Sequence, residues 1–244
     1  MVIPIRLIND DGMTSTAQII YAFQKADALG AQIINCSWGS VYPSIAGVQS
    51  ELSDSEKNLY KTIASKGNNG KGIITVFASG NNSYTDFNTL PEARSEFNLA
   101  TAASDSSDSI TSYSNLAEEL DLIAPGGDSQ APIYTLDRAD ITKINQNGIE
   151  KIKIQGYNKG NIATSFKGTS AAAAVASGVA GLVRSINPIL SAQEVKDILL
   201  ETANPLACPI TDDSDCGAGR INAGEAAYKA STTDSTVDQT FVSF

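Results

Sequence analysis

Short apolar runs alternate with a helical pattern over the first part of the chain. Residues 2–8 form an apolar run that ends at a turn cluster, and residues 32–38 form a second run. Between them, apolar side chains recur at helical spacing from Ala17 to Leu29, and Gly30 follows as a helix stop. This order predicts a strand–helix–strand unit. Strands joined by a helix run parallel with a right-handed crossover, so we expect an α/β fold around a parallel sheet.

The same alternation continues along the chain. Ser53 and Ser191 are each followed three residues later by a glutamate, the capping-box pattern that starts a helix. Further strands are expected at 73–78, 98–102 and 120–124, and further helices at about 169–186 and 192–203.

The chain is interpreted as one domain. Its 244 residues, 42% hydrophobic and 18% charged, suffice for one sizeable core. After Pro125 the sequence becomes polar and β-branched around Asn147-Gly148, a hairpin turn signal. We therefore expect a β-hairpin insertion at about 134–164, and a polar tail from about residue 231 with an edge strand at 240–244.

Composition excludes two classes of partner. A formal net charge of −10 argues against nucleic-acid binding, which needs a basic face. The longest apolar run, residues 171–183, is shorter than the roughly 18 residues of a membrane span. The first residues also lack the basic start, apolar centre and cleavage site of a signal peptide. We expect neither a nucleic-acid nor a membrane partner.

The three cysteines fall into two groups. Cys36 lies in an apolar run and is expected to be a buried thiol. Cys208 and Cys216 flank a polar loop and are close enough in sequence to form a small disulfide loop, although two free thiols are the alternative. A disulfide would place the protein outside a reducing cytosol.

A candidate nucleophile lies where a loop enters an alanine-rich helix, at Gly168-Thr169-Ser170. Thr169 and Ser170 have a simpler interpretation as helix caps. A serine nucleophile needs a positioned base, and the chain contains no histidine.

Other polar segments follow predicted strands and are expected to meet at the carboxyl edge of the sheet. Ser79-Gly80-Asn81 ends one buried strand, Asn35-Cys36-Ser37-Trp38-Gly39 ends another, and Ala124-Pro125-Gly126 ends a third. For Asn81 a plain turn residue is the alternative interpretation.

With these motifs in this order, the chain resembles the subtilisin-like serine proteases from about Ile3 to about Ala227. The matching segments are residues 33–39, 77–81, 97–126, 168–170 and 216–223. The resemblance implies a three-layer α/β fold with a mainly parallel central sheet between helices, here without the family's first strands. The motif departs from the family at Ala174 and Val175, where proline and histidine are common but perform no chemistry.

The resemblance also implies roles for individual residues. Ser170 would attack the scissile carbonyl, and Asn81 would donate its side-chain amide to the oxyanion. The substrate, a polypeptide, would pair with two strand ends: Ser37, Trp38 and Gly39 on one side and Ala78, Ser79 and Gly80 on the other. Trp38 would wall a pocket or serve as a core aromatic.

The family's histidine base and its aspartate partner have no counterpart here. In subtilisin itself, loss of the base or the nucleophile lowers turnover about a million-fold, so we expect negligible activity from this chain alone. The leading interpretation is a fragment of a serine endopeptidase. A catalytically dead pseudoprotease that binds peptides, or a half-enzyme completed by a separate N-terminal chain, are the alternatives; a propeptide is a further implied partner.

Two other kinds of residue could replace the histidine as the base. Lys167 precedes Ser170 by three residues, and serine–lysine pairs are known chemistry. The related sedolisins use glutamate and aspartate, but they carry aspartate where Asn81 stands. Both are the weaker alternatives.

No cofactor is required by this interpretation. Calcium is common in the family, but no site for it is identified here, and no metal ligands are predicted. The family and the Cys208–Cys216 bond together imply a secreted or periplasmic protein. Cleavage specificity does not follow from the sequence.

Overall fold

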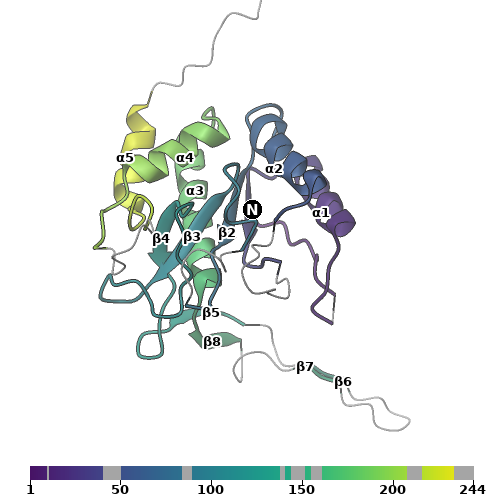
Figure 1. The fold of residues 1–244 in the computed structure, drawn as a ribbon, viewed down its shortest axis with the longest axis vertical. Coiled ribbons are helices and arrows are strands. Elements are labelled where there is room, and N and C mark those ends of the chain that lie inside the picture. The colour runs from purple at the N-terminus through teal and green to yellow at the C-terminus, as the bar shows by residue number, and fades with distance from the viewer. Residues whose placement is uncertain are drawn as a thin grey trace, which may run out of the picture.

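A parallel sheet of four strands lies at the centre of the fold (Figure 1). The computed structural model describes residues 1–9, 11–40, 51–83, 90–137, 141–143, 152–154, 161–207 and 216–233. The strands, in spatial order, are β1 (Ile33–Cys36), β2 (Ile74–Ala78), β3 (Leu99–Ser104) and β4 (Leu122–Pro125). All three strand pairs are parallel. The predicted α/β class and parallel sheet are confirmed.

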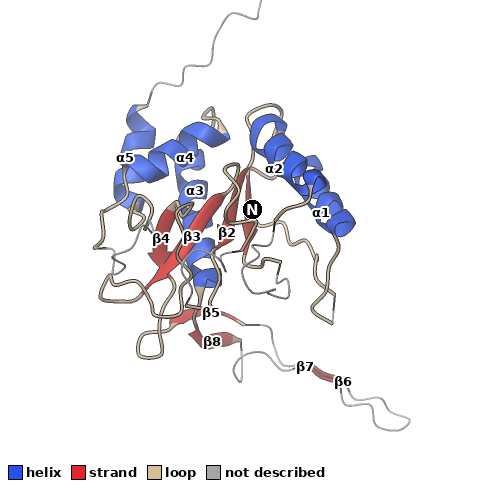
Figure 2. Ribbon diagram, in the orientation of Figure 1, coloured by secondary structure: helices blue, strands red, loops and turns tan. Residues whose placement is uncertain are grey.

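Helices cover both faces of this sheet, which gives three layers (Figures 1 and 2). On one face lie α1 (Thr16–Ala28) and α2 (Asp54–Lys66). On the other lie α3 (Thr169–Ile186), α4 (Ala192–Glu201) and α5 (Ala223–Thr232). The buried side chains form one hydrophobic cluster on each face.

Helix α3 is the central element of its layer and contacts all four strands. Its buried face consists largely of alanines, and β2 and β3 also present alanines to it. By length and composition α3 also qualifies as a membrane span, with a mean hydropathy of 1.3 and half of the helix buried inside the protein. This corrects the expectation that no segment reaches that length, although the packing of α3 is that of a core helix.

In the region of the predicted insertion, which stays a prediction, two antiparallel strand pairs are present where one hairpin was expected. β5 (Ile133–Leu136) pairs with β8 (Ile162–Phe166), and β6 (Ile141–Lys143) pairs with β7 (Ile152–Ile154). The turn predicted at Asn147-Gly148 lies outside the described residues. Helix α5 (Ala223–Thr232) ends just past the predicted start of the tail at about residue 231. Residues 234–244, including the expected edge strand, are outside the described part.

The strand predicted at residues 2–8 is absent from the structure, where this segment has no regular secondary structure. An isolated strand leaves its main-chain groups unpaired, so it forms only beside a partner. Instead of pairing with β1, the segment lies across a groove from it, and both line that groove. The apolar composition predicts a strand, but strand pairing depends on a neighbour that the sequence pattern does not reveal.

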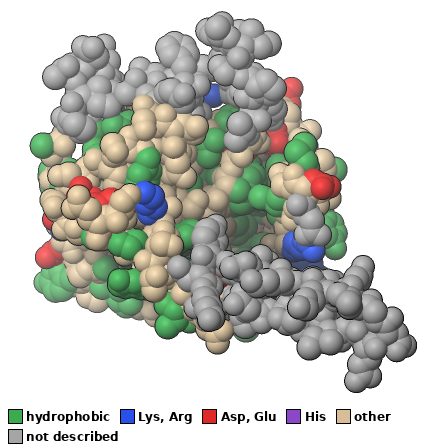
Figure 3. Space-filling model, turned by 90° about the horizontal axis from the view of Figure 1, so that it is seen from below, with side chains coloured by type: hydrophobic (Ala, Val, Ile, Leu, Met, Phe, Trp, Pro, Cys, Tyr) green, Lys and Arg blue, Asp and Glu red, His purple; other side chains and the backbone are tan. Residues whose placement is uncertain are grey.

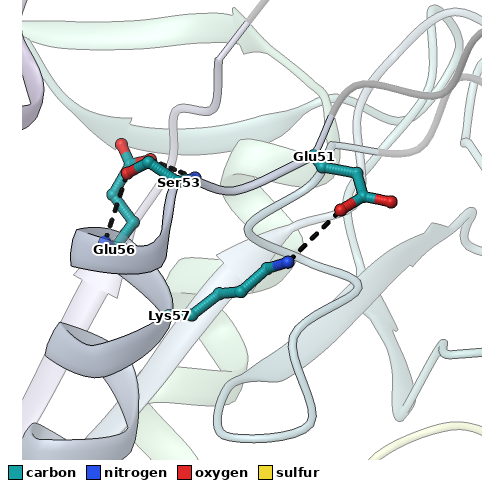
Figure 4. Close-up of polar contacts among 4 residues, drawn as sticks. All are labelled: Glu51, Ser53, Glu56 and Lys57. Carbon is teal, nitrogen blue, oxygen red and sulfur yellow. Dashed lines mark hydrogen bonds and ion pairs between the residues drawn. The ribbon is translucent and has the colours of Figure 1, made fainter.

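Both predicted capping boxes are present. In α2, the Ser53 main-chain N–H donates to the Glu56 carboxylate at 3.0 Å, and the Glu56 N–H donates to the Ser53 hydroxyl at 3.3 Å (Figure 4). Glu56 is buried and also accepts from the hydroxyl of Thr16, at 3.3 Å, which ties α2 to the start of α1. Nearby, Lys57 and Glu51 form an ion pair at 3.2 Å between exposed side chains.

These two contacts predict different costs of substitution. Ser53→Ala removes a helix cap and should lower the free energy of unfolding by about 1–2 kcal/mol. Lys57→Ala breaks only the solvent-exposed pair and should cost less than about 0.5 kcal/mol. Urea unfolding followed by circular dichroism measures both variants. If Lys57→Ala lowered the free energy of unfolding more than Ser53→Ala, the helix cap would not be the stronger of the two contacts.

Candidate active site

Ser170 lies in the first turn of α3. The N-cap is Gly168, with a φ of 137° and no side-chain capping bond, so Thr169 and Ser170 do not cap the helix. The N–H of Gly168 donates to the carbonyl of Gly126, just after β4, at 3.0 Å. A φ in this range suits only glycine without strain. The start of α3 is therefore held at the carboxyl end of the sheet, as the motif order predicted.

Thr169 joins the helix start to the end of β2. Its main-chain N–H and its hydroxyl both donate to the side-chain oxygen of Asn81, at 2.8 and 2.9 Å. The same hydroxyl accepts from the N–H of Gly80 at 3.2 Å. Thr169 is fully buried. We call this set of bonds between Thr169, Gly80 and Asn81 the Thr169 clasp.

The clasp determines which way the Asn81 amide faces. Because the Oδ1 atom accepts two bonds from Thr169, the Nδ2 group is left as a donor beside Gly168. A Cβ placed on Gly168 would lie 3.3 Å from this Nδ2. In the described part of the chain, neither Nδ2 nor the main-chain N–H of Ser170 has an acceptor. Two N–H donors at the start of one helix can stabilise negative charge that develops there.

The end of β1 is bonded directly to the candidate nucleophile. The Ser170 hydroxyl donates to the carbonyl of Ser37 at 3.2 Å, and the Ser37 hydroxyl donates to the carbonyl of Ser170 at 2.8 Å. The Ser37 hydroxyl also accepts from the side chain of Asn35 at 3.0 Å, and Asn35 accepts from the hydroxyl of Ser177 at 3.1 Å. These bonds connect Ser177, in the middle of α3, to the main chain of Ser170.

The end of β2 is a buried, tightly packed segment. Gly80 has a φ of 110°, and a Cβ there would lie 2.3 Å from the side chain of Asn115. Asn115 is fully buried and binds both sides of Gly80: its N–H donates to the Gly80 carbonyl at 2.9 Å, and its Oδ1 accepts from the N–H of Asn82 at 2.8 Å. Ala78 and Ser79 are buried too, and the main-chain N–H of Ser79 donates to the carbonyl of Thr101. The substrate contacts predicted for Ala78, Ser79 and Gly80 stay predictions.

Trp38 and Gly39 continue β1 past Ser37. Trp38 is partly buried and packs edge-to-face on Phe77, with ring centroids 5.3 Å apart. It also lines the groove beside β1. Its packing on Phe77 agrees with the interpretation as a core aromatic, whereas its role as the wall of a substrate pocket stays a prediction. A Cβ on Gly39 would lie 2.3 Å from the side chain of Leu90, so a larger residue there would require this side chain to move.

Several supporting residues were missed from the sequence. Glu92 is fully buried and accepts from both the N–H and the hydroxyl of Ser40, which holds the segment after Gly39. Tyr113 donates its phenol to the carbonyl of Gly127 at 2.6 Å, and burial is the main cause that raises the pKa of this phenol. Glu92 and Asn115 both lie among other polar residues in the sequence, so nothing in the local pattern sets them apart. No local motif marks them.

The Lys167 alternative has no support in this geometry, and the glutamate and aspartate alternative stays untested. The Lys167 ammonium donates to the hydroxyl of Ser129 at 2.6 Å and not to Ser170. Within the described ranges, no group of three or more His, Cys, Asp or Glu residues is arranged to hold a metal ion.

Seen from below the view of Figure 1, the described surface is mostly hydrophobic or uncharged, with acidic and basic side chains scattered singly (Figure 3).

The cysteine predictions differ in outcome. Cys36 is a free, buried thiol as expected, and burial raises the pKa of this thiol well above its usual value. Cys216 is buried at 6% exposure, whereas Cys208 lies outside the described residues. The disulfide between Cys208 and Cys216 stays a prediction.

The Thr169 clasp can be tested by changing one hydroxyl. Thr169→Val leaves the buried Gly80 N–H without its acceptor and should lower the free energy of unfolding by about 1–3 kcal/mol. Thr169→Ser keeps the oxygen and loses one methyl group, which should cost about 1 kcal/mol or less. Chemical unfolding compares the two variants. Equal stability of the valine and serine variants would show that the clasp does not hold this end of the helix.

Comparison with known proteins agrees with this architecture. The family model described as "Subtilase family" matches residues 1–238. A calcium-dependent protease of Nostoc sp. is 31% identical over 245 residues, which cover 93% of this chain and 36% of that protein. The halolysin-like extracellular serine protease Nep of Natrialba magadii is 29% identical and is matched over 89% of this chain and 32% of its own length. The chain thus spans about a third of the length of these relatives.

Among solved structures, a protease from Pseudoalteromonas arctica superposes with a TM-score of 0.69 at 21% sequence identity, over 93% of this chain and 62% of that one. At this level of identity the likeness concerns the fold. Together with the order of the strand ends around Ser170 and the family match over nearly the whole sequence, it leads to one conclusion: this chain belongs to the subtilase family of serine proteases.

Proposed function

We propose that this chain carries the nucleophile and the oxyanion donors of a serine endopeptidase. Ser170 is the nucleophile, and the Asn81 Nδ2 group and the Ser170 N–H are the oxyanion donors. The observation that carries this proposal is the Thr169 clasp, which turns the Asn81 amide so that its N–H₂ group lies beside the start of α3.

In the proposed reaction, the Ser170 oxygen forms a bond to the carbonyl carbon of a peptide. The carbonyl oxygen becomes an oxyanion that accepts from the two donors, and the positive end of the α3 dipole adds to this stabilisation. The hydroxyl proton must pass to a base. Since the chain has no histidine and the Ser170 hydroxyl donates to a carbonyl, we place the base on a polypeptide segment outside this chain.

The substrate is a polypeptide in this proposal, bound in extended form along the main chain of Ser37 to Gly39. The position of Ser37 supports this, because its carbonyl is already within hydrogen-bond distance of the nucleophile, at 3.2 Å. The proposal extends to secretion or export to the periplasm. The relative Nep is named as an extracellular protease, and the predicted Cys208–Cys216 bond would suit an oxidising compartment.

A second function, peptide binding without cleavage, is favoured by one observation. The Ser170 hydroxyl donates to the Ser37 carbonyl, so the chain by itself holds the nucleophile in a bond to an acceptor that cannot take its proton. The chain alone would then act as a pseudoprotease. The same experiment distinguishes the two functions.

The experiment supplies a base from solution. The chain is incubated with a fluorophosphonate probe at pH 8 to 9, with and without added imidazole, and labelling is located by mass spectrometry. We expect imidazole-dependent labelling of Ser170 and none in Ser170→Ala. Asn81→Ala should slow labelling by about 10²–10³-fold, the loss measured for such a donor in subtilisin itself. Asn82→Ala, the matched control at an exposed position, should label at the unchanged rate.

Labelling elsewhere than Ser170, or no labelling at any imidazole concentration, would contradict the endopeptidase proposal and favour the pseudoprotease. Without imidazole, we expect hydrolysis of a peptide ester to stay at background, because loss of the base costs about 10⁶ in subtilisin turnover. A rate typical of a complete subtilisin would contradict the absence of a base.

A further inference from the structure

The side chain of Leu90 lies between two glycines, one after β1 and one after β2. The last aligned pair of these two strands is Cys36 with Phe77, and the chain then continues to Gly39 on one side and to Gly80 on the other. A Cβ on Gly39 would lie 2.3 Å from the Leu90 Cδ1 atom, and one on Gly80 would lie 3.6 Å from the Leu90 Cγ atom. We call the space between these glycines the Gly39–Gly80 slot. The leucine side chain occupies it.

The two walls of this slot are tied to the start of α3. The carbonyl of Ser37, two residues before Gly39, accepts from the Ser170 hydroxyl at 3.2 Å. On the other wall, the N–H of Gly80 donates to the hydroxyl of Thr169, the residue before Ser170, at 3.2 Å. The slot therefore begins beside the proposed nucleophile.

Main-chain hydrogen bonds hold Leu90 in the slot. Its N–H donates to the carbonyl of Ser79 at 3.4 Å, and its carbonyl accepts from the N–H groups of Ala93, at 2.9 Å, and Arg94, at 3.2 Å. The side chain is partly exposed and packs against the hydrophobic cluster on the α1–α2 face of the sheet. Because the residue is bonded on both sides of its Cα atom, we expect Leu90 to stay in the slot when a peptide binds.

The nearby carboxylate of Glu92 is not open to a substrate. Glu92 is fully buried, and its carboxylate already accepts from the N–H and the hydroxyl of Ser40, the residue after Gly39. Its carbonyl accepts from the side-chain amide of Asn98 at 2.8 Å, which fixes this turn from below. The slot therefore presents the apolar side chain of Leu90, and not a charge, to a group that enters it.

We propose that Leu90 is a specificity-determining residue, which limits the side chain on the acyl side of the cleaved bond to that of glycine, alanine or serine. This inference rests on the proposed function, in which an extended peptide lies along Ser37 to Gly39 with its carbonyl carbon at Ser170. The residue that carries this carbonyl then lies at the entrance of the slot.

The size and polarity of the slot give this selectivity. A large side chain would have to share the space with Leu90, and close-packed protein has no spare volume for both. A charged side chain would lose hydration against the leucine without gaining a partner. A small uncharged side chain needs no movement of Leu90, so it is the class of substrate that fits the slot as it stands.

The test uses diphenyl phosphonates of three peptides, acetyl-dialanyl compounds that end in alanine, phenylalanine or arginine. Their phosphorus takes the place of the carbonyl carbon, so the last side chain has a fixed position. Trp38, the single tryptophan, lies between Ser37 and Gly39 in the chain, and its fluorescence reports binding. We expect the alanine compound to bind at least tenfold more tightly than the other two, within the range of about 10- to 200-fold that small size differences produce in an apolar pocket.

Three variants check that Leu90 is the cause. Leu90→Ala empties most of the slot and should shift the preference at least tenfold toward the phenylalanine compound. Leu90→Met conserves the volume and should keep the preference for alanine. Leu206→Ala is the matched control, because Leu206 is another partly buried leucine of the same cluster but is not among the side chains nearest to either glycine. It should leave the preference unchanged, and circular dichroism confirms the fold of each variant.

Equal binding of the alanine and phenylalanine compounds, no saturable binding, or an unchanged preference in Leu90→Ala would overturn the proposal. Tightest binding of the arginine compound would assign the slot to basic side chains and would also overturn it.

Covalent labelling by the same compounds is measured separately, by mass spectrometry with added imidazole. In that step the Ser170 oxygen forms a bond to phosphorus, phenolate leaves, and imidazole takes the hydroxyl proton. Selective binding without labelling of Ser170 would contradict the proposed function and leave the role of Leu90 in binding standing. Labelling of Ser170 at equal rates by the alanine and phenylalanine compounds would support the proposed function and overturn the role of Leu90.

Discussion

The close approach of α3 to the sheet is the constraint on which the rest of the structure depends. Alanines on the helix face alanines on β2 and β3, so the helix can contact all four strands at once. Any larger side chain on this face would push the helix outward, because protein interiors have no spare volume. The start of α3 is fixed relative to the ends of β1, β2 and β4 through this packing. Ser170 takes its place from the core rather than from a loop.

Around that fixed point, the polar groups of the site are oriented by hydrogen bonds between main chain and side chain. Thr169, buried beneath the surface, orients the Asn81 amide, and Asn115 holds Gly80 from the other side. Donors fixed in this way need little reorganisation when charge develops, which is where most of the benefit of an oxyanion site arises. The requirement for glycine at positions 80 and 168 follows from the same close contacts.

The elements that the sequence predicted well are those governed by local pattern. The capping serines Ser53 and Ser191 mark the starts of two helices, and α3 has the predicted bounds. The strand expected at residues 2–8 was wrong because pairing needs a neighbour. The sequence allows Thr169 to be a helix cap, yet its hydroxyl donates a hydrogen bond to the side chain of Asn81, 88 positions away. Glu92 and Tyr113 escaped notice because burial at the site depends on tertiary contacts that no short motif encodes.

The open edge of β1 also bears on how the sheet is protected. Natural sheets protect an edge strand with lysine, proline, a bulge or a covering segment, and the four residues of β1, Ile33 to Cys36, include neither lysine nor proline. Of these devices, only a covering segment is then left for β1, and residues 2–8 lie across the groove from it.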